Sequence, residues 1–159
     1  MSSIIKFLES HLSQEMALLI ISALPLVELK GAIPIGHALG LSTVKTYFIS
    51  YIGSLLPVPF ILLFIRKIFE IMRKNKKLSK IVDKILNKAN KKAKDMNKKS
   101  YLALFIFVSI PLPSTGVWMG SLLATIFGLN RLYAFLVIAA GNSVAALIMS
   151  LLSHIFIKG

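Results

Sequence analysis

The chain has 159 residues, of which 56% are hydrophobic, and 19 Lys and Arg against six Asp and Glu give a formal net charge of +13. Soluble domains are nearer 45–50% apolar, and the lack of cysteine excludes disulfides and thiolate metal sites. Residues 46–65, 101–130 and 132–157 contain no Asp, Glu, Lys or Arg, and about 20 such residues cross a bilayer core. The composition therefore predicts an all-α integral membrane protein.

The positive charge is concentrated in residues 66–99, which hold 14 basic and three acidic residues, a net charge of +11. A basic block between apolar segments predicts a cytoplasmic location for that block. Its expected partners are anionic lipid headgroups. Because the block lies between membrane segments, we expect no nucleic-acid partner.

The first apolar segment contains charged residues at a depth where charge is costly. Residues 4–12 have apolar positions at helical spacing and predict a short interfacial helix. Residues 15–41 follow, and Glu28 and Lys30 interrupt them. An ionisable residue inside a membrane costs several kcal/mol unless it is paired or faces a wet cavity. The segment predicts a re-entrant helical hairpin, and the residues expected at its turn are Pro25, Gly31 and Pro34.

Residues 46–65 predict a spanning helix that is bent by Pro57 and Pro59. In residues 78–96 the apolar positions repeat in steps of three or four, which predicts an amphipathic basic helix on the membrane surface. Self-association through the apolar face of that helix is the less favoured alternative.

Residues 101–130 are too many for one ordinary crossing and too few for two, which need about 40 residues. Prolines near the middle remove backbone donors and clash with the preceding turn. The segment predicts a second re-entrant hairpin, and the residues expected at its turn are Pro111, Pro113 and Gly116. Residues 132–157 predict the second full span.

The two halves of the chain carry similar motifs in the same order. A single crossing separates the two hairpins, so they must enter from opposite faces, as in the inverted repeats of many secondary transporters. We predict one membrane domain over residues 1–159, with a first repeat (1–65), a basic cytoplasmic connector (66–99) and a second repeat (100–159). The matched motifs are Leu24-Pro25-Leu26 with Ile110-Pro111-Leu112, Gly31 with Gly116, Gly40-Leu41 with Gly128-Leu129, and Gly53-Ser54 with Gly141-Asn142.

Small and polar residues within the spans predict helix packing. Gly53 and Gly141 are expected to permit close helix contacts, and Asn142 to make an interhelical hydrogen bond. His37 is compatible with a proton relay, although a packing role is commoner for a lone histidine.

Residues 25–36 (PLVELKGAIPIG) and 111–121 (PLPSTGVWMGS) resemble the putative small multidrug export protein family, and the resemblance covers nearly the whole chain. It implies export of small molecules by a multi-pass protein of the cell membrane. The architecture also resembles the more distant DedA superfamily, which includes translocases of lipid-linked phosphates and lipid scramblases. DedA-like proteins typically place an acidic residue in the first re-entrant loop and an arginine in the second. Glu28 matches the first position, but residues 111–116 contain no arginine.

Five residues near the two turns are candidates for substrate or ion binding. Glu28 is either a coupling carboxylate for protons or cations, or a structural group that pairs with Lys30 or caps the N-terminus of the second half-helix. Lys30 either binds an anionic headgroup or neutralises Glu28. Ser114 and Thr115 either offer hydroxyls to a substrate or satisfy backbone groups that the prolines release. Trp118 is either an interfacial anchor or a stacking surface.

No catalytic constellation is apparent, and the three histidines at 11, 37 and 154 share no ligand spacing. We therefore expect no enzyme, no metal and no cofactor. The leading hypothesis is ion-coupled export of small amphipathic molecules through a midplane site between the two re-entrant loops. The alternative is translocation of a lipid or lipid-linked phosphate, and a third hypothesis is a lipid-organising structural protein. A homodimer would help to enclose the polar turns.

Overall fold

The computed structural model describes residues 13–75, 79–80, 82–83, 98–112 and 115–158. In these ranges the chain is helical and contains no strand, which confirms the predicted all-α class. The helix expected at residues 4–12 and most of the helix expected at 78–96 lie outside the described residues. The helices are α2 (Gln14–Ala23), α3 (Glu28–Ala38), α4 (Thr43–Leu55), α5 (Pro57–Arg73), α7 (Lys98–Ser109), α8 (Val117–Ile126) and α9 (Arg131–Lys158).

Both predicted interruptions are present. Residues 24–27 separate α2 from α3, and residues 110–116 separate α7 from α8. These four helices have 10 to 12 residues each, or about 15–18 Å at 1.5 Å per residue. The length of each one is therefore about half the thickness of a ~30 Å hydrocarbon core.

Pro34 does not lie in the first turn, contrary to expectation. It lies within α3, and Gly31 is also helical. A proline has no N–H to donate to the carbonyl four residues earlier, but apolar helices that pack against neighbours tolerate this loss. Pro25 remains in the turn between α2 and α3.

Two stretches are long and apolar enough to cross a membrane, Thr43–Ile65 and Arg131–Ser153, each with 23 residues and a mean hydropathy of 2.2. The first combines α4 with the start of α5, and the two helices divide at Leu56, directly before Pro57. Only 28% and 33% of the residues in their most apolar windows are buried in the protein. A core helix of a soluble protein would bury most of its apolar residues, whereas these helices bury only a minority of the residues in these windows.

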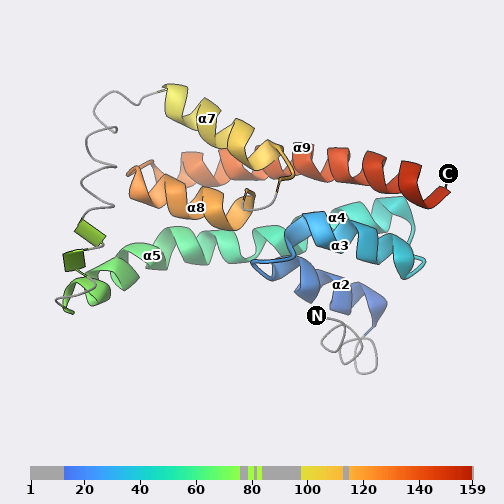
Figure 1. Cartoon of the computed structure of the whole chain (residues 1–159), viewed down its shortest axis with the longest axis horizontal. Helices are drawn as coiled ribbons and strands as arrows, with labels where there is room; N and C mark the ends of the chain where they lie inside the picture. Colours follow the sequence, from blue (N-terminus) through green and yellow to red (C-terminus); the bar gives the residue numbers. More distant parts are fainter. Residues whose placement is uncertain (1–12, 76–78, 81, 84–97, 113–114, 159) are drawn as a thin grey trace.

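The helices form two hairpins, α2–α3 and α7–α8, beside two long rods, which are the α4–α5 pair and α9. Figure 1 shows that α9 and the α4–α5 pair run along the long axis, while the α2–α3 and α7–α8 hairpins occupy opposite halves of the molecule. Helix α9 packs on α7 and α8 through Ala134 and Ile138, and on α3 through Ala145 and Ala146. The turns of the two hairpins come together near the middle of the long axis.

The second helix of each hairpin ends in the same way. Gly40 after α3 has φ 78° and Gly128 after α8 has φ 67°. In each case the next residue donates its N–H to a carbonyl five residues back, from Leu41 to Gly36 and from Leu129 to Ala124. These bonds form Schellman motifs, which end helices with a left-handed glycine.

The glycines of the two rods make equivalent contacts with the first helix of each hairpin. A Cβ atom on Gly53 would lie 2.5 Å from the carbonyl oxygen of Leu19 in α2, and one on Gly141 would lie 2.9 Å from that of Phe105 in α7. Asn142 of α9 donates from Nδ2 to Ser54 Oγ of α4 over 2.8 Å. The predicted close helix contacts and the interhelical hydrogen bond are therefore confirmed.

Candidate functional site

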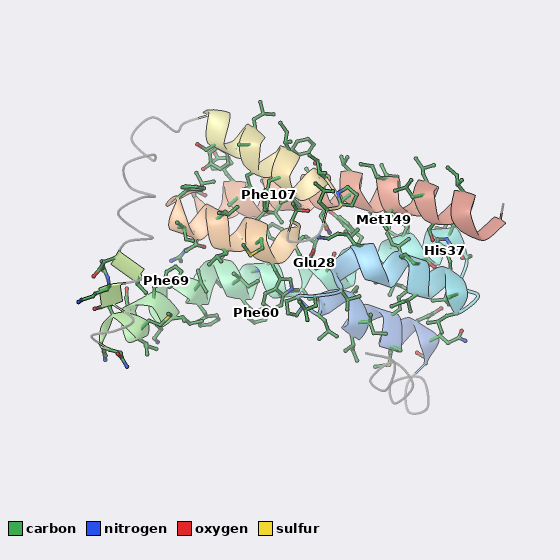
Figure 2. All side chains as sticks on the ribbon, viewed as in Figure 1. Glu28, His37, Phe60, Phe69, Phe107 and Met149 are labelled. Carbon is green, nitrogen blue, oxygen red and sulfur yellow. The ribbon has the colours of Figure 1, made fainter. Side chains whose placement is uncertain are left out.

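A cavity of about 690 Å³ opens where the two turns meet. Figure 2 shows Glu28 near the middle of the long axis, between the two hairpins. Cavities of this size accommodate small-molecule ligands in other proteins. Its lining comes from both turns, from α3 and from the start of α8: Pro25, Leu26, Val27, Glu28, Lys30, Gly31, Ile35, Pro111, Thr115, Trp118 and Met119.

Glu28 is buried and lies at the first position of α3 in a left-handed conformation, with φ 49° and 4% exposure. Its Oε2 atom lies 2.9 Å from Lys30 Nζ. Its Oε1 atom accepts the backbone N–H of Trp118 over 3.1 Å. That N–H belongs to the first turn of α8, where amides lack helical partners and the helix dipole favours negative charge. The carboxylate of one hairpin therefore caps the second helix of the other.

Lys30, which carries the opposite charge, also links the two turns. Its ammonium donates to the carbonyl oxygen of Leu112 over 3.0 Å and also to the carbonyl oxygen of Thr115. With Glu28 Oε2, these contacts engage the three donors that an ammonium has. The predicted pairing of Glu28 with Lys30 is thus present in the geometry, whereas the helix that the carboxylate caps is α8 of the other hairpin and not α3.

Gly116 allows the carboxylate to approach. Its φ is 116°, and a Cβ atom there would lie 2.1 Å from Glu28 Oε2. The residue offset that relates Gly40 to Gly128 also relates Glu28 to Gly116. Equivalent positions therefore share a left-handed backbone and touch each other across the centre of the molecule.

Thr115 and Trp118 both line the cavity, but Thr115 uses its backbone there. The Thr115 hydroxyl bonds within its own turn, lying 2.7 Å from the carbonyl oxygen of Ile110 and 3.1 Å from the N–H of Leu112. Trp118 donates its indole N–H to the carbonyl of Ala23 at the end of α2 over 3.1 Å. Pro113 and Ser114 lie outside the described residues.

Sequence reasoning missed the carbonyl of Leu112, because a backbone acceptor leaves no trace in side-chain identity. It also missed the apolar wall that Leu26, Ile35 and Met119 contribute to the cavity. The only available signal was proximity to the prolines, which does not distinguish these residues from their neighbours.

His37 lies far from Glu28, toward the other end of α3 (Figure 2). Its Nδ1 atom is 3.1 Å from Ser153 Oγ and its Nε2 atom is 3.3 Å from Thr43 Oγ1. These contacts are typical of a packing histidine that links three helices. Within the described part of the chain, no group of three His, Asp or Glu is placed to hold a metal ion.

Residues 28–148 match the family described as "Putative small multi-drug export protein". The matched range begins at the cavity carboxylate, directly after the first turn, and includes the second turn. The chain belongs to this family. Its family and its two apolar helices indicate a membrane protein, with transport rather than enzymatic catalysis as the implied activity. Comparison with curated proteins and with solved structures gave no match.

Proposed function

We propose that this protein is a multi-pass exporter of the cell membrane that moves small amphipathic molecules through the cavity between the two turns. The observation that carries the proposal is the cavity itself, since a buried carboxylate and an ammonium line it where two interrupted helical segments meet. Ionisable groups at membrane depth usually mark a substrate or ion pathway. Glu28 is the proposed coupling group for a proton or another cation.

The proposed topology is an inverted repeat of two re-entrant hairpins. The matching Schellman motifs at Gly40 and Gly128 and the matching contacts of Gly53 and Gly141 support this arrangement. Hairpin helices of about half the membrane thickness bring both turns to the bilayer centre. Broken helices of this kind form the central binding sites of many secondary transporters.

Single-cysteine labelling tests the topology, because the native chain has no cysteine. Cysteines replacing Ser2, Ser79 and Gly159 one at a time should react from outside, inside and outside, respectively. The charge of +11 in residues 66–99 sets this orientation. Labelling of position 159 from the cytoplasm alone would mean that the second hairpin crosses fully, which would end the inverted-repeat proposal.

Transport is tested in liposomes that contain the purified protein. Efflux of a cationic dye driven by a proton gradient should depend on the protein and be lost in Glu28→Gln. Translocation of a labelled lipid without dye efflux would instead favour the DedA-like alternative. We rank that alternative second, because the ammonium of Lys30, the sole cation among the described lining residues, already contacts three oxygens. Activity in neither assay would favour a structural role.

A further inference from the structure

We propose that the exported molecules are primary amines with an apolar body, and that the Lys30 ammonium occupies the position where their ammonium group binds. Lys30 is then an internal competitor that is tethered to the site. This inference rests on the proposed function, because it names the substrate class of the same cavity. Its basis is the set of oxygens around Lys30 Nζ, which come from Glu28, Leu112 and Thr115.

Those three acceptors match a primary ammonium. An R–NH₃⁺ group has three N–H donors and no acceptor, and each donor finds one oxygen here. A quaternary ammonium has no N–H and could donate to none of these three oxygens. An anion would face a carboxylate and two carbonyl oxygens, which repel it. The head-group chemistry is therefore specific for a cation that donates several hydrogen bonds.

The rest of the cavity matches an apolar body. Leu26, Ile35 and Met119 line it, together with the ring of Trp118. The Lys30 side chain retains 19% exposure, and its four-carbon stem rotates freely enough to withdraw the ammonium when another one replaces it. The exchange leaves Glu28 paired in both states, so its charge is not stranded in an apolar surrounding.

A tethered competitor weakens the binding of the free ligand. Short flexible tethers give effective concentrations in the millimolar range, so the substrate must displace Lys30 before it binds. Removal of the Lys30 charge should therefore tighten the binding of a primary amine. If Lys30 instead held a phosphate group, its removal would abolish binding of the phosphate. The two hypotheses therefore predict opposite changes in ligand affinity for the same substitution.

The test uses three probes with the same tail, octylammonium, octyltrimethylammonium and octyl phosphate, added to the protein in liposomes of neutral lipid. Trp118 is the chain's sole tryptophan and lines the cavity, so its fluorescence reports occupancy. Wild type should bind octylammonium more tightly than either other probe. Lys30→Met, which keeps an unbranched stem, should raise the octylammonium affinity by about tenfold. Lys30→Arg keeps a competing cation and should not raise it, and Glu28→Gln should lose octylammonium binding.

Equal or weaker octylammonium binding in Lys30→Met would overturn the inference, as would a preference for octyl phosphate that Lys30→Met removes. If the Lys30→Met variant does not fold without a ligand, octylammonium should restore its folding and octyltrimethylammonium should not. Equal restoration of folding by both probes would overturn the inference. Efflux from liposomes separates this inference from the proposed function. Amine binding with no efflux contradicts only the export proposal, and efflux with no effect of Lys30→Met on affinity contradicts only the role of Lys30.

Discussion

Helices α3 and α8 each begin at or next to a residue with positive φ. The residue type at that position differs between the two turns. The first uses Glu28 and contributes a carboxylate and the nearby ammonium of Lys30. The second uses Gly116 and contributes an amide and two carbonyls from neighbouring residues. One turn supplies the charges and the other supplies the backbone partners for them.

This difference shows how two equivalent positions become one site. Glu28 and Gly116 touch, so a side chain at one position requires its absence at the other. A left-handed conformation costs a non-glycine residue about 1–2 kcal/mol. The chain accepts that cost at Glu28, which is consistent with a role for the carboxylate beyond local packing.

The largest effect is expected from Glu28→Ala, which removes the carboxylate that contacts both the Lys30 ammonium and the Trp118 N–H. Lys30 would lose its counter-ion and the start of α8 would lose its cap. Breaking a buried pair costs about 3–5 kcal/mol, and the two carbonyls that still hold Lys30 reduce the expected loss to about 2–3 kcal/mol. Unfolding in detergent measures this stability. Wild-type stability together with wild-type transport would mean that the first turn needs no carboxylate.

Gly116→Ala should destabilise the second turn by about 2 kcal/mol, because a Cβ atom would add backbone strain to a clash with Glu28 Oε2. Gly40→Ala is the matched control, since Gly40 also has positive φ but no atom lies within 4 Å of the position that its Cβ atom would take. It should lose only about 1 kcal/mol. In the background Glu28→Gly, the part of the cost of Gly116→Ala that comes from the clash should disappear, and a purely additive double mutant would contradict the contact between the two positions.

A smaller difference in stability is expected between substitutions of the glycines in the two rods. Gly53→Ala should cost more stability than Gly141→Ala, because its Cβ atom would meet Ser22 Oγ at 1.9 Å and the Leu19 carbonyl at 2.5 Å. The closest neighbour of a Cβ atom on Gly141 lies at 2.9 Å, so a smaller helix shift suffices there. Thermal unfolding of the two variants ranks them. The reverse order would show that the halves of the molecule do not pack as described.

The smallest effect is expected from Lys45→Ala, which breaks an ion pair remote from the turns. Lys45 Nζ lies 2.8 Å from Glu15 Oε1, but the two side chains are 61% and 48% exposed, against 19% and 5% for Lys30 and Glu28. Exposed pairs contribute little to stability. The melting temperature should be unchanged within error, and a drop as large as that of Glu28→Ala would contradict the importance of burial in this comparison.

Much of this fold could be predicted from the sequence. Pro25 and the prolines near residue 111 break apolar runs, and composition alone predicts the two long helices. The match between the halves was predicted at Gly40 with Gly128 and at Gly53 with Gly141. Proline and glycine identities, however, aligned Gly31 with Gly116, whereas the helix ends align Glu28 with Gly116.

The site was harder to predict than the fold. Glu28, Lys30, Thr115 and Trp118 were predicted near one another, and all four line the cavity. Two contacts of Lys30 depend on carbonyl oxygens, which every residue has, so no residue type in the second turn indicates them. The sequence left two roles open for the Thr115 hydroxyl, and its bonds within its own turn match the structural one.

The depth of Trp118 in the bilayer shows directly whether the two turns meet near the bilayer centre. This residue is the chain's sole tryptophan, and its N–H groups bond to Glu28 and to Ala23 of the other hairpin. Its fluorescence can be quenched by lipids that carry bromine at defined positions along the acyl chain. We expect the strongest quenching with bromine near the ends of the chains, about 15 Å from either surface of the ~30 Å core. Strongest quenching with bromine beside the headgroups would place Trp118 at the interface and contradict a meeting of the turns at the centre.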